Sequence, residues 1–197
     1  MWRIYKHSLA HGYNQKLSLS VLRVDYMLHQ QPNSEITQIK QVEINTISAG
    51  FGHVSTRMST LHREILTWSG YKNLLDKLPP NAPIEGIAAG FVEAWRRYGN
   101  PKAIIIFLIL DIEINIADQR HLEYEIRRQE PDIEIVRCTL EQIHENGHLN
   151  EDKVLIYNEQ EVAIVYFRAG YDPIHYKSDK VCLLFETWSN ISKTLFM

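Results

Sequence analysis

The sequence predicts an α/β protein in which a helix and hairpin part is followed by a doubly wound, Rossmann-like part. Two β-rich runs meet at a polar turn near the start, two amphipathic helical patterns follow, and an apolar run then opens a βαβ pattern. This change of pattern places the boundary between the two parts near residue 101.

The first part begins with a predicted hairpin whose strands, 17–27 and 36–47, are separated by the polar turn Gln30–Ser34. In the second strand Val42 and Ile44 alternate with polar residues, so one face of the hairpin is expected to be apolar.

Two helices, 54–68 and 84–98, are predicted next, because apolar residues recur every three or four positions. Gly99 and Pro101 mark the end of the second helix. The two stripes are Val54, Met58, Leu61, Ile65 and Trp68, and Ile84, Ile87, Phe91, Trp95 and Tyr98.

The second part opens with the apolar run 103–110, which is too short for a membrane span of about 20 residues. Such a run is typical of a strand buried on both faces. A helix at 115–129 and a strand at 132–137 complete a βαβ pattern, and 153–167 is predicted to form two strands joined at Asn158–Gln160.

The composition, 45% apolar and 23% charged with a net charge of −3, is that of an ordinary globular protein. The absence of any basic block argues against nucleic acid and anionic membranes as partners. Cys138 and Cys182 stand far apart without a CxxC pair, which indicates reduced thiols. With no signal peptide pattern at the start, the expected location is the cytoplasm.

Glu43 and Asn45 are the first candidate binding residues. Two positions apart on a strand, they point to the same face and offer the oxygen ligands that Mg²⁺ prefers, although a solvated strand face has the same spacing. The hydroxyl- and glycine-rich segment Thr46–Gly52 then leads into a predicted helix, whose free N–H groups favour an anion. The stretch 41–52 is therefore predicted to bind a cation and an anionic small molecule.

Glu113, Asn115 and Gln119 follow the strand 103–110, at the edge where open α/β sheets bind their ligands. Gln119 falls on the inward stripe of the next helix, where a buried amide needs partners. Asn115 is also explained as a helix N-cap, with Asp118 at the third helical position.

Arg168, close to Tyr171, ends an apolar run and is suited to bind a carboxylate at a strand end. Arg23 offers the same chemistry in the first hairpin. An ion pair between Arg23 and Glu43 or Asp25 is an equally good explanation of that arginine.

His144 and His148 spell the HExxH signature of zinc proteases, which requires both histidines one turn apart on a regular helix. Asn146-Gly147 is instead a turn signal, so a metalloprotease is not the expected function.

Taken together, four motifs resemble the eukaryotic type of glutathione synthetase in order and spacing, from about residue 1 to about residue 177. They are RVDYM (23–27), QVEINTISAGFG (41–52), NIADQR (115–120) and VYFRAGYDP (165–173). The resemblance implies a homodimeric ATP-grasp ligase that joins glycine to γ-glutamylcysteine through an acyl-phosphate, with ATP and Mg²⁺. It also implies that residues 1–101 belong to an ATP-grasp body, 102–177 to a substrate-binding domain and 178–197 to a divergent tail.

By this resemblance Glu43 and Asn45 are magnesium ligands, and Glu43 also lies near the nucleotide. An acid such as Glu113 can pair with the α-ammonium of the dipeptide, and arginines can pair with its carboxylates. The residues implied to hold the dipeptide are Arg23, Ile47, Ser48, Ala49, Gly50, Glu113, Ile114, Asn115, Gln119, Arg168 and Tyr171.

Three residues depart from the family pattern. Gly50 stands where a serine is usual, which removes a hydrogen bond worth about 1 kcal/mol. His53 stands where a second glycine is common, and Ile114 replaces a usual arginine.

The glycine-rich loop, the ATP-binding lysines and the third magnesium ligand of the family lie beyond the resemblance, so the chain is expected to be partial and inactive alone. The alternative is a non-catalytic module that binds γ-glutamylcysteine or dimerises. Without the ATP-grasp body, the apolar faces of helices 54–68 and 84–98 are expected to be exposed.

Overall fold

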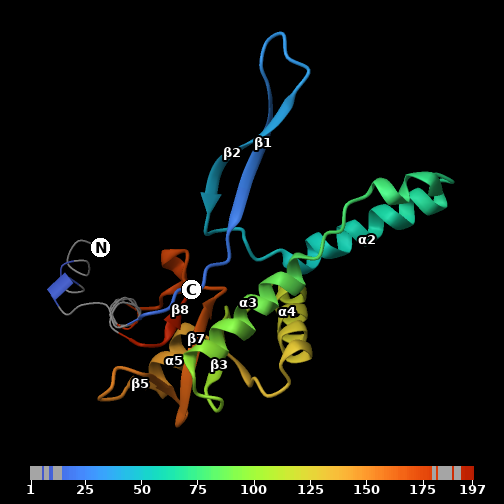
Figure 1. The fold of residues 1–197 in the computed structure, drawn as a ribbon. Coiled ribbons are helices and arrows are strands. Elements are labelled where there is room, and N and C mark those ends of the chain that lie inside the picture. Colours follow the sequence, from blue (N-terminus) through green and yellow to red (C-terminus); the bar gives the residue numbers. More distant parts are fainter. Residues whose placement is uncertain (1–5, 7–8, 11–14, 179–180, 182–187, 189–191) are drawn as a thin grey trace.

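The computed structural model describes residues 6, 9–10, 15–178, 181, 188 and 192–197. It is a mixed α/β fold with a compact helix and sheet body, from which a long hairpin and a helical arm project (Figure 1). Among the described residues, no helix is long and apolar enough to cross a membrane.

The projecting hairpin consists of the antiparallel strands β1 (Arg23–Gln30) and β2 (Thr37–Asn45), with an irregularity between Asp25 and Tyr26. The prediction of a hairpin is therefore confirmed, but the first strand starts at Arg23 rather than at residue 17.

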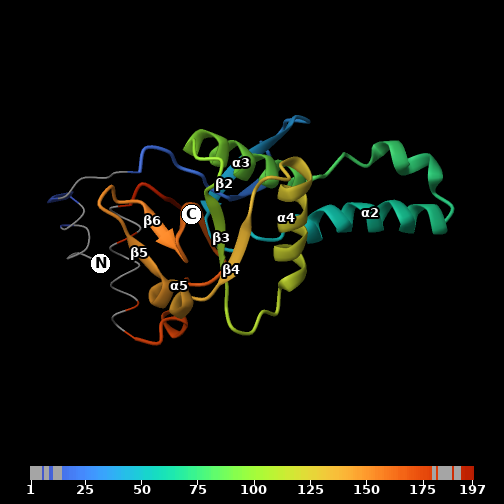
Figure 2. The same ribbon diagram turned by 90° about the horizontal axis from the view of Figure 1, so that it is seen from below.

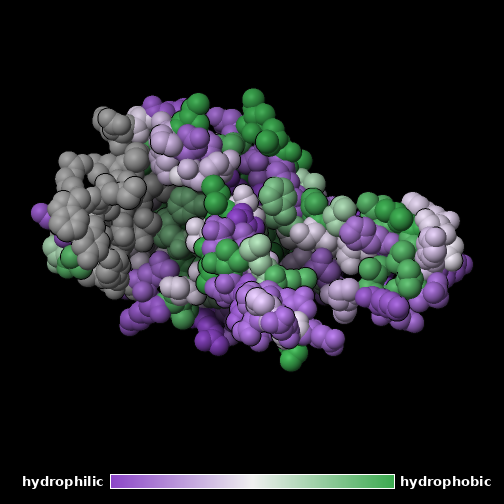
Figure 3. Space-filling model, turned by 90° about the horizontal axis from the view of Figure 1, so that it is seen from above, coloured by the Kyte–Doolittle hydropathy of each residue, from purple (hydrophilic) through white to green (hydrophobic). Residues whose placement is uncertain are grey.

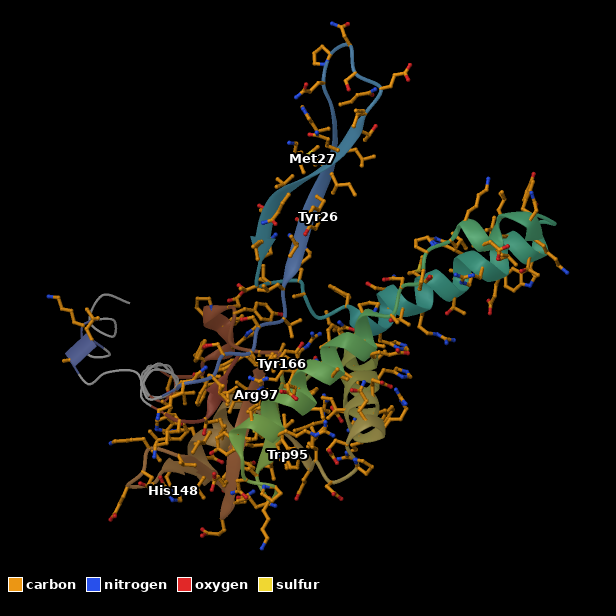
Figure 4. The ribbon with its side chains drawn as sticks, in the orientation of Figure 1. Tyr26, Met27, Trp95, Arg97, His148 and Tyr166 are labelled. Atoms are coloured by element: carbon orange, nitrogen blue, oxygen red, sulfur yellow. The ribbon has the colours of Figure 1, made fainter. Side chains whose placement is uncertain are left out.

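Residues Leu17, Leu19 and Val21 instead pack on the body core. The predicted apolar face of the hairpin is not buried, because every residue of β2 except Asn45 is exposed. Tyr26 and Met27 likewise stand on the projecting part, well away from Trp95 (Figure 4).

Helix α2 (Gly52–Trp68) confirms the first predicted helix, and its stripe from Val54 to Trp68 is exposed as expected. Together with the 3₁₀ helix η1 (Lys72–Lys77), it forms the arm, on which apolar and polar side chains alternate in patches (Figure 3).

Helix α3 (Pro83–Tyr98) confirms the second predicted helix and ends at Gly99, whose φ of 90° is the left-handed conformation of a C-cap. Its apolar face is not exposed, contrary to expectation: Ile84, Phe91 and Trp95 are buried against the sheet, and the Trp95 indole donates to the Ala103 carbonyl at 2.7 Å. The chain's own sheet covers this face of the helix.

The central sheet has the order β4-β3-β7-β6-β5, with β8 paired to β7. Strands β3 (Ile104–Leu108), β4 (Ile135–Cys138) and β7 (Gln160–Phe167) run parallel, and every residue of β3 is buried, as the apolar run predicts. Helix α4 (Ile116–Gln129) connects β3 to β4 and lies beside α3 (Figure 2). The predicted βαβ unit is thereby confirmed.

Strand β6 (Leu155–Tyr157) joins β7 antiparallel through a tight turn, so the sheet is mixed. Asn158 and Glu159 take φ values of 46° and 64°, which explains the break predicted at 158–160. Strand β4 begins three residues later than its predicted start at 132, because Pro131 and Asp132 form a turn.

The HExxH residues fall on two elements. His144 lies in the short helix α5 (Leu140–Asn146), which the sequence analysis missed. His148 lies in strand β5 (Gly147–Leu149). Figure 4 shows it well separated from Tyr166, a residue of β7. The helix ends at the predicted Asn146-Gly147 position, so the two histidines do not share a helical face.

Residues 192–197 lie in the body, where β8 (Leu195–Phe196) adds a parallel strand to the later half of β7. Ser192 and Thr194 are fully buried beside it. A second 3₁₀ helix, η2 (Pro173–His175), follows β7.

Cys138 is free and buried, and desolvation raises the pKa of its thiol to about 12. It is therefore a reduced structural thiol. Cys182 lies outside the described residues.

Candidate functional site

The site is built at the edge where the parallel strands β3, β4 and β7 end. Glu113 follows β3, and its two carboxylate oxygens accept from the Leu110 backbone N–H at 2.9 Å and from the Gln119 amide nitrogen at 2.6 Å. Gln119 is 2% exposed, so it is the buried, partnered amide that its stripe position predicts. Two of the predicted residues are therefore in direct contact.

Arg137, at the end of β4, was missed by the sequence analysis. Its Nη2 donates to the Gln119 amide oxygen at 2.6 Å, and its Nη1 pairs with buried Glu123. Glu123 also accepts from Arg120 at 2.8 Å. A basic residue that ends a strand is the signal that singled out Arg168, and the same signal was available for Arg137.

Arg168 follows β7, and its backbone N–H donates to the Leu108 carbonyl at 2.8 Å, which fixes it beside the end of β3. Its Nη1 donates to the Tyr166 hydroxyl at 3.2 Å, and its guanidinium carbon lies 5.9 Å from the centre of that ring. Tyr166, another residue that was missed, packs edge-on against Phe91 and Phe107.

Gly50 lies directly against this guanidinium. A Cβ atom added at Gly50 would stand 1.4 Å from Nη1 and 2.5 Å from the guanidinium carbon of Arg168. The missing side chain therefore does more than remove a hydroxyl, because its volume is taken by the charged end of Arg168.

The loop that carries Gly50 is tied to the base of the hairpin. Arg23 donates through Nη1 to the Ile47 carbonyl at 3.3 Å, and Ser48 turns the loop with a φ of 53°. Ala49 and Gly50 are half-buried, whereas Ile47 and Ser48 are exposed. The predicted loop residues thus connect the hairpin to Arg168.

Glu43 and Asn45 share one face of β2, as their spacing predicts, and the Asn45 amide nitrogen donates to Glu43 at 2.8 Å. Arg23 forms an ion pair with Asp25 at 2.9 Å and approaches Glu43 at 3.7 Å, so the ion-pair explanation of Arg23 holds in this structure. Its hydrogen bond to Asp25 lowers the pKa of that carboxyl.

The carboxylates of Asp25 and Glu43 and the amide oxygen of Asn45 are the kind of oxygen ligands that bind a hard cation, together with oxygens of water and phosphate. The residues therefore fit a magnesium ion held through one or two protein ligands. In the described part of the chain, no group of three or more His, Cys, Asp or Glu is placed to hold a metal by itself.

At the start of helix α2, one of the backbone N–H groups predicted to favour an anion is already used within the chain. Asp118, 3% exposed on α4, accepts from the Val54 backbone N–H at 3.0 Å, so one free donor of the first turn already has a carboxylate partner. Asn115 is the N-cap residue of α4, as one explanation had it, but its side chain makes no capping bond. Asp118 thus caps a different helix from its own.

His53, beside this cap, stacks on His121 with ring centres 3.6 Å apart. Burial lowers the pKa of His53, and the charge of His121 lowers it further, while Asp118 opposes the shift. The pair therefore favours the neutral form of His53 at the base of the Gly50 loop.

Replacing Asp118 with alanine is expected to destabilise the fold by about 1–2 kcal/mol, as for the loss of an N-cap. The Val54 N–H would lose its acceptor inside the protein. The measurement is the midpoint of urea unfolding, with the exposed Asp132→Ala as the matched control. Equal midpoints for the two variants would contradict the assignment.

Two predicted residues stand apart from the contacts described above. Ile114 is 98% exposed, and Tyr171 is 64% exposed and meets the ring of His175 edge-on. Both lie on the surface near the strand ends.

A model of the family "Eukaryotic glutathione synthase, ATP binding domain" matches residues 1–181. The chain is similar to the glutathione synthetase of Homo sapiens, with 38% identity over 176 residues, which are 89% of this chain and 36% of the relative. It is also similar to the chloroplastic glutathione synthetase of Arabidopsis thaliana, with 34% identity over 178 residues, 89% of this chain and 32% of the relative. The chain spans about a third of the length of these relatives.

A solved structure, of a glutathione synthetase-like effector from Globodera pallida in its apo form, has a similar fold. The TM-score is 0.77 at 21% identity, and the match covers 99% of this chain and 43% of the other. At this identity the similarity concerns the fold alone. It reaches residues beyond the family match, which ends at 181.

Proposed function

Because the chain belongs to the eukaryotic glutathione synthase family, we propose that it carries the γ-glutamylcysteine-binding part of a glutathione synthase. The observation that supports this most directly is that Glu113 and Arg168 follow the ends of the neighbouring parallel strands β3 and β7, inside the matched residues. A carboxylate and a guanidinium at the same sheet edge suit a ligand that bears both an ammonium and carboxylates.

Each charged group in the proposed site retains capacity for a ligand. Glu113 accepts one hydrogen bond at each oxygen, and a carboxylate has about four acceptor positions, so the α-ammonium of γ-glutamylcysteine can still be bound. The Arg168 guanidinium has five N–H donors, of which one meets Tyr166. We propose Arg23, the loop 47–50, Ile114, Asn115, Gln119 and Tyr171 as the further contacts of the dipeptide.

Glu43 and Asn45 are the residues that would hold Mg²⁺, with Glu43 also near ATP. A magnesium ion there would neutralise phosphate charge during formation of an acyl-phosphate. On this proposal Arg23 gives up part of its ion pairing with Asp25 and Glu43 when a cation and a carboxylate ligand arrive.

In the family arrangement that we propose, residues 1–101 are part of an ATP-grasp body and 102–177 a Rossmann-like substrate-binding domain, followed by the tail 178–197. The complete enzyme would ligate glycine to γ-glutamylcysteine as a cytoplasmic homodimer. Because this chain spans about a third of its relatives, we propose that it binds the dipeptide but does not ligate it alone.

Titration calorimetry of the 197-residue chain with γ-glutamylcysteine, without ATP, is expected to show binding. The same protein is expected to release no phosphate from ATP and Mg²⁺ when both γ-glutamylcysteine and glycine are supplied. The first result follows from the carboxylate of Glu113 and the guanidinium of Arg168 at the same sheet edge, and the second from the chain's span of about a third of its relatives' length.

A heat of binding measured with γ-glutamylcysteine, but not with cysteine, would assign the binding to the γ-glutamyl end of the dipeptide. Phosphate release that depends on both substrates would overturn the inactivity of the chain. A folded chain that binds no dipeptide would overturn the proposed function itself, including its alternative as a non-catalytic dipeptide-binding module.

A further inference from the structure

Three side chains form a relay behind the proposed ammonium site. Arg137 donates to the oxygen of the Gln119 amide, and the nitrogen of that amide donates to Glu113, each over 2.6 Å. Glu113 is held at its other oxygen by the Leu110 N–H. The relay joins the ends of β3 and β4 across the first turns of α4.

The order of the atoms in this relay is determined by chemistry. Gln119 can place either its oxygen or its nitrogen toward a neighbour, but arginine has donors only. Arg137 therefore requires the amide oxygen on its side, and the amide nitrogen must then face Glu113. With that orientation reversed, an oxygen would face the Glu113 carboxylate and repel it.

Arg137 can serve this role because its own position is fixed. Its side chain is 12% exposed and pairs with Glu123, whose side chain is 4% exposed. Nη1 of the guanidinium forms this ion pair, and Nη2 donates to the Gln119 amide oxygen. A lysine offers one point of charge rather than a planar fork and cannot reproduce both contacts with the same geometry.

We propose that Arg137 is a positioning residue for recognition of the ligand's ammonium group. It fixes the Gln119 amide, which in turn fixes the Glu113 carboxylate at the proposed α-ammonium site. This inference rests on the proposed function, because it assigns one end of the same ligand. Arg137 itself does not touch the ligand.

The test compares two ligands that differ only at the amine. Calorimetry is run with γ-glutamylcysteine and with glutarylcysteine, which lacks the α-amino group. Arg137→Met is expected to weaken binding of γ-glutamylcysteine about tenfold, the loss typical of one well-placed polar contact, and to leave binding of glutarylcysteine unchanged. A merely structural effect would weaken both ligands alike.

Arg137→Met leaves the buried Glu123 with the more exposed Arg120 as its remaining ion-pair partner, so the variant can fail to fold for that reason alone. The double variant Arg137→Met/Glu123→Gln removes the buried charge and is expected to show the same selective loss. Arg127→Met, on an exposed arginine of α4, is the matched control and is expected to change neither affinity.

In a Gln119→Met background the substitution at Arg137 should have no further effect on the preference for the amine, because the relay is already broken. Equal losses for both ligands, or a selective loss that persists without Gln119, would overturn the inference and leave the proposed function intact. Absence of γ-glutamylcysteine binding to the folded, unsubstituted chain would overturn both.

Discussion

Deletion of residues 192–197 is expected to leave the body largely unfolded at room temperature. These residues provide β8, which pairs Leu195 with Ile164 and Phe196 with Val165 on the open half of β7. The Met197 N–H donates to the Val165 carbonyl at 3.0 Å, and the Met197 carbonyl accepts from Phe167 at 2.9 Å. The deletion therefore removes the neighbouring strand from the end of β7 that leads directly to Arg168.

The expected loss comes from burial and from hydrogen bonds together. Leu195 is 2% exposed, and burying such a side chain contributes roughly 1.5–3 kcal/mol. The Thr194 hydroxyl donates to the Val162 carbonyl at 2.8 Å and accepts from the Leu155 N–H at 3.2 Å; bonds of this kind contribute about 1 kcal/mol each. The sum is on the order of 5 kcal/mol, which is comparable with the whole stability of a typical domain.

Circular dichroism and thermal melting measure this effect. Thr194→Val keeps the shape of the side chain but leaves the Leu155 N–H without its acceptor, so it is expected to lower stability by about 1–3 kcal/mol. The exposed Lys193→Ala serves as the control within the same segment. A shortened chain that melts like the full chain would show that β8 does not support the body.

Arg168→Gln is expected to weaken γ-glutamylcysteine binding about 10- to 100-fold, because it removes hydrogen bonds from a charged donor worth roughly 1.5–3 kcal/mol. The fold should be unaffected, since the guanidinium is half-buried and contacts Tyr166 by its tip. Arg97→Gln, on an exposed arginine of α3 that pairs with Glu93, is the matched control.

Gly50→Ala tests how the guanidinium reaches its position. The added Cβ would take the place of Nη1, so Arg168 must move away from Tyr166, and affinity is expected to fall about tenfold. The atom displaced is the end of a flexible side chain, so the melting temperature should change little. Loss of affinity accompanied by unfolding would contradict this account.

The double variant Gly50→Ala/Arg168→Gln should bind no more weakly than Arg168→Gln alone, because both changes remove the same interaction. Additive losses would mean that Gly50 and Arg168 act on the ligand separately. The calorimetric protocol is the same for all four proteins of this cycle.

Local periodicity was enough to predict several elements and contacts. The stripes of α2 and α3, the end of α3 at Gly99 and the buried strand β3 all follow from patterns within about 15 residues. The shared face of Glu43 and Asn45 and the inward position of Gln119 follow from the same geometry of strand and helix.

Contacts between distant segments were not predictable in this way. Nothing near Asp118 in the sequence indicates that it caps α2, 64 positions away, and nothing near Arg137 names Gln119 as its partner. The exposure of the hairpin and the burial of the α3 stripe also depended on tertiary packing, because the sheet covers α3 and no described part of the body covers the hairpin strand β2.

The sequence by itself determined helices α2, α3 and α4, the parallel strands β3 and β4, the family, and the residue types proposed to bind an ammonium, carboxylates and a cation. Those features depend on side-chain chemistry and on periods of two and 3.6 residues, which a single segment contains. Only the tertiary structure decided that Arg168 fills the space beside Gly50, that Arg137 orients Gln119 and that residues 192–197 complete the sheet. Those outcomes depend on which atoms compete for the same space and the same donors, and that is settled only when distant segments pack.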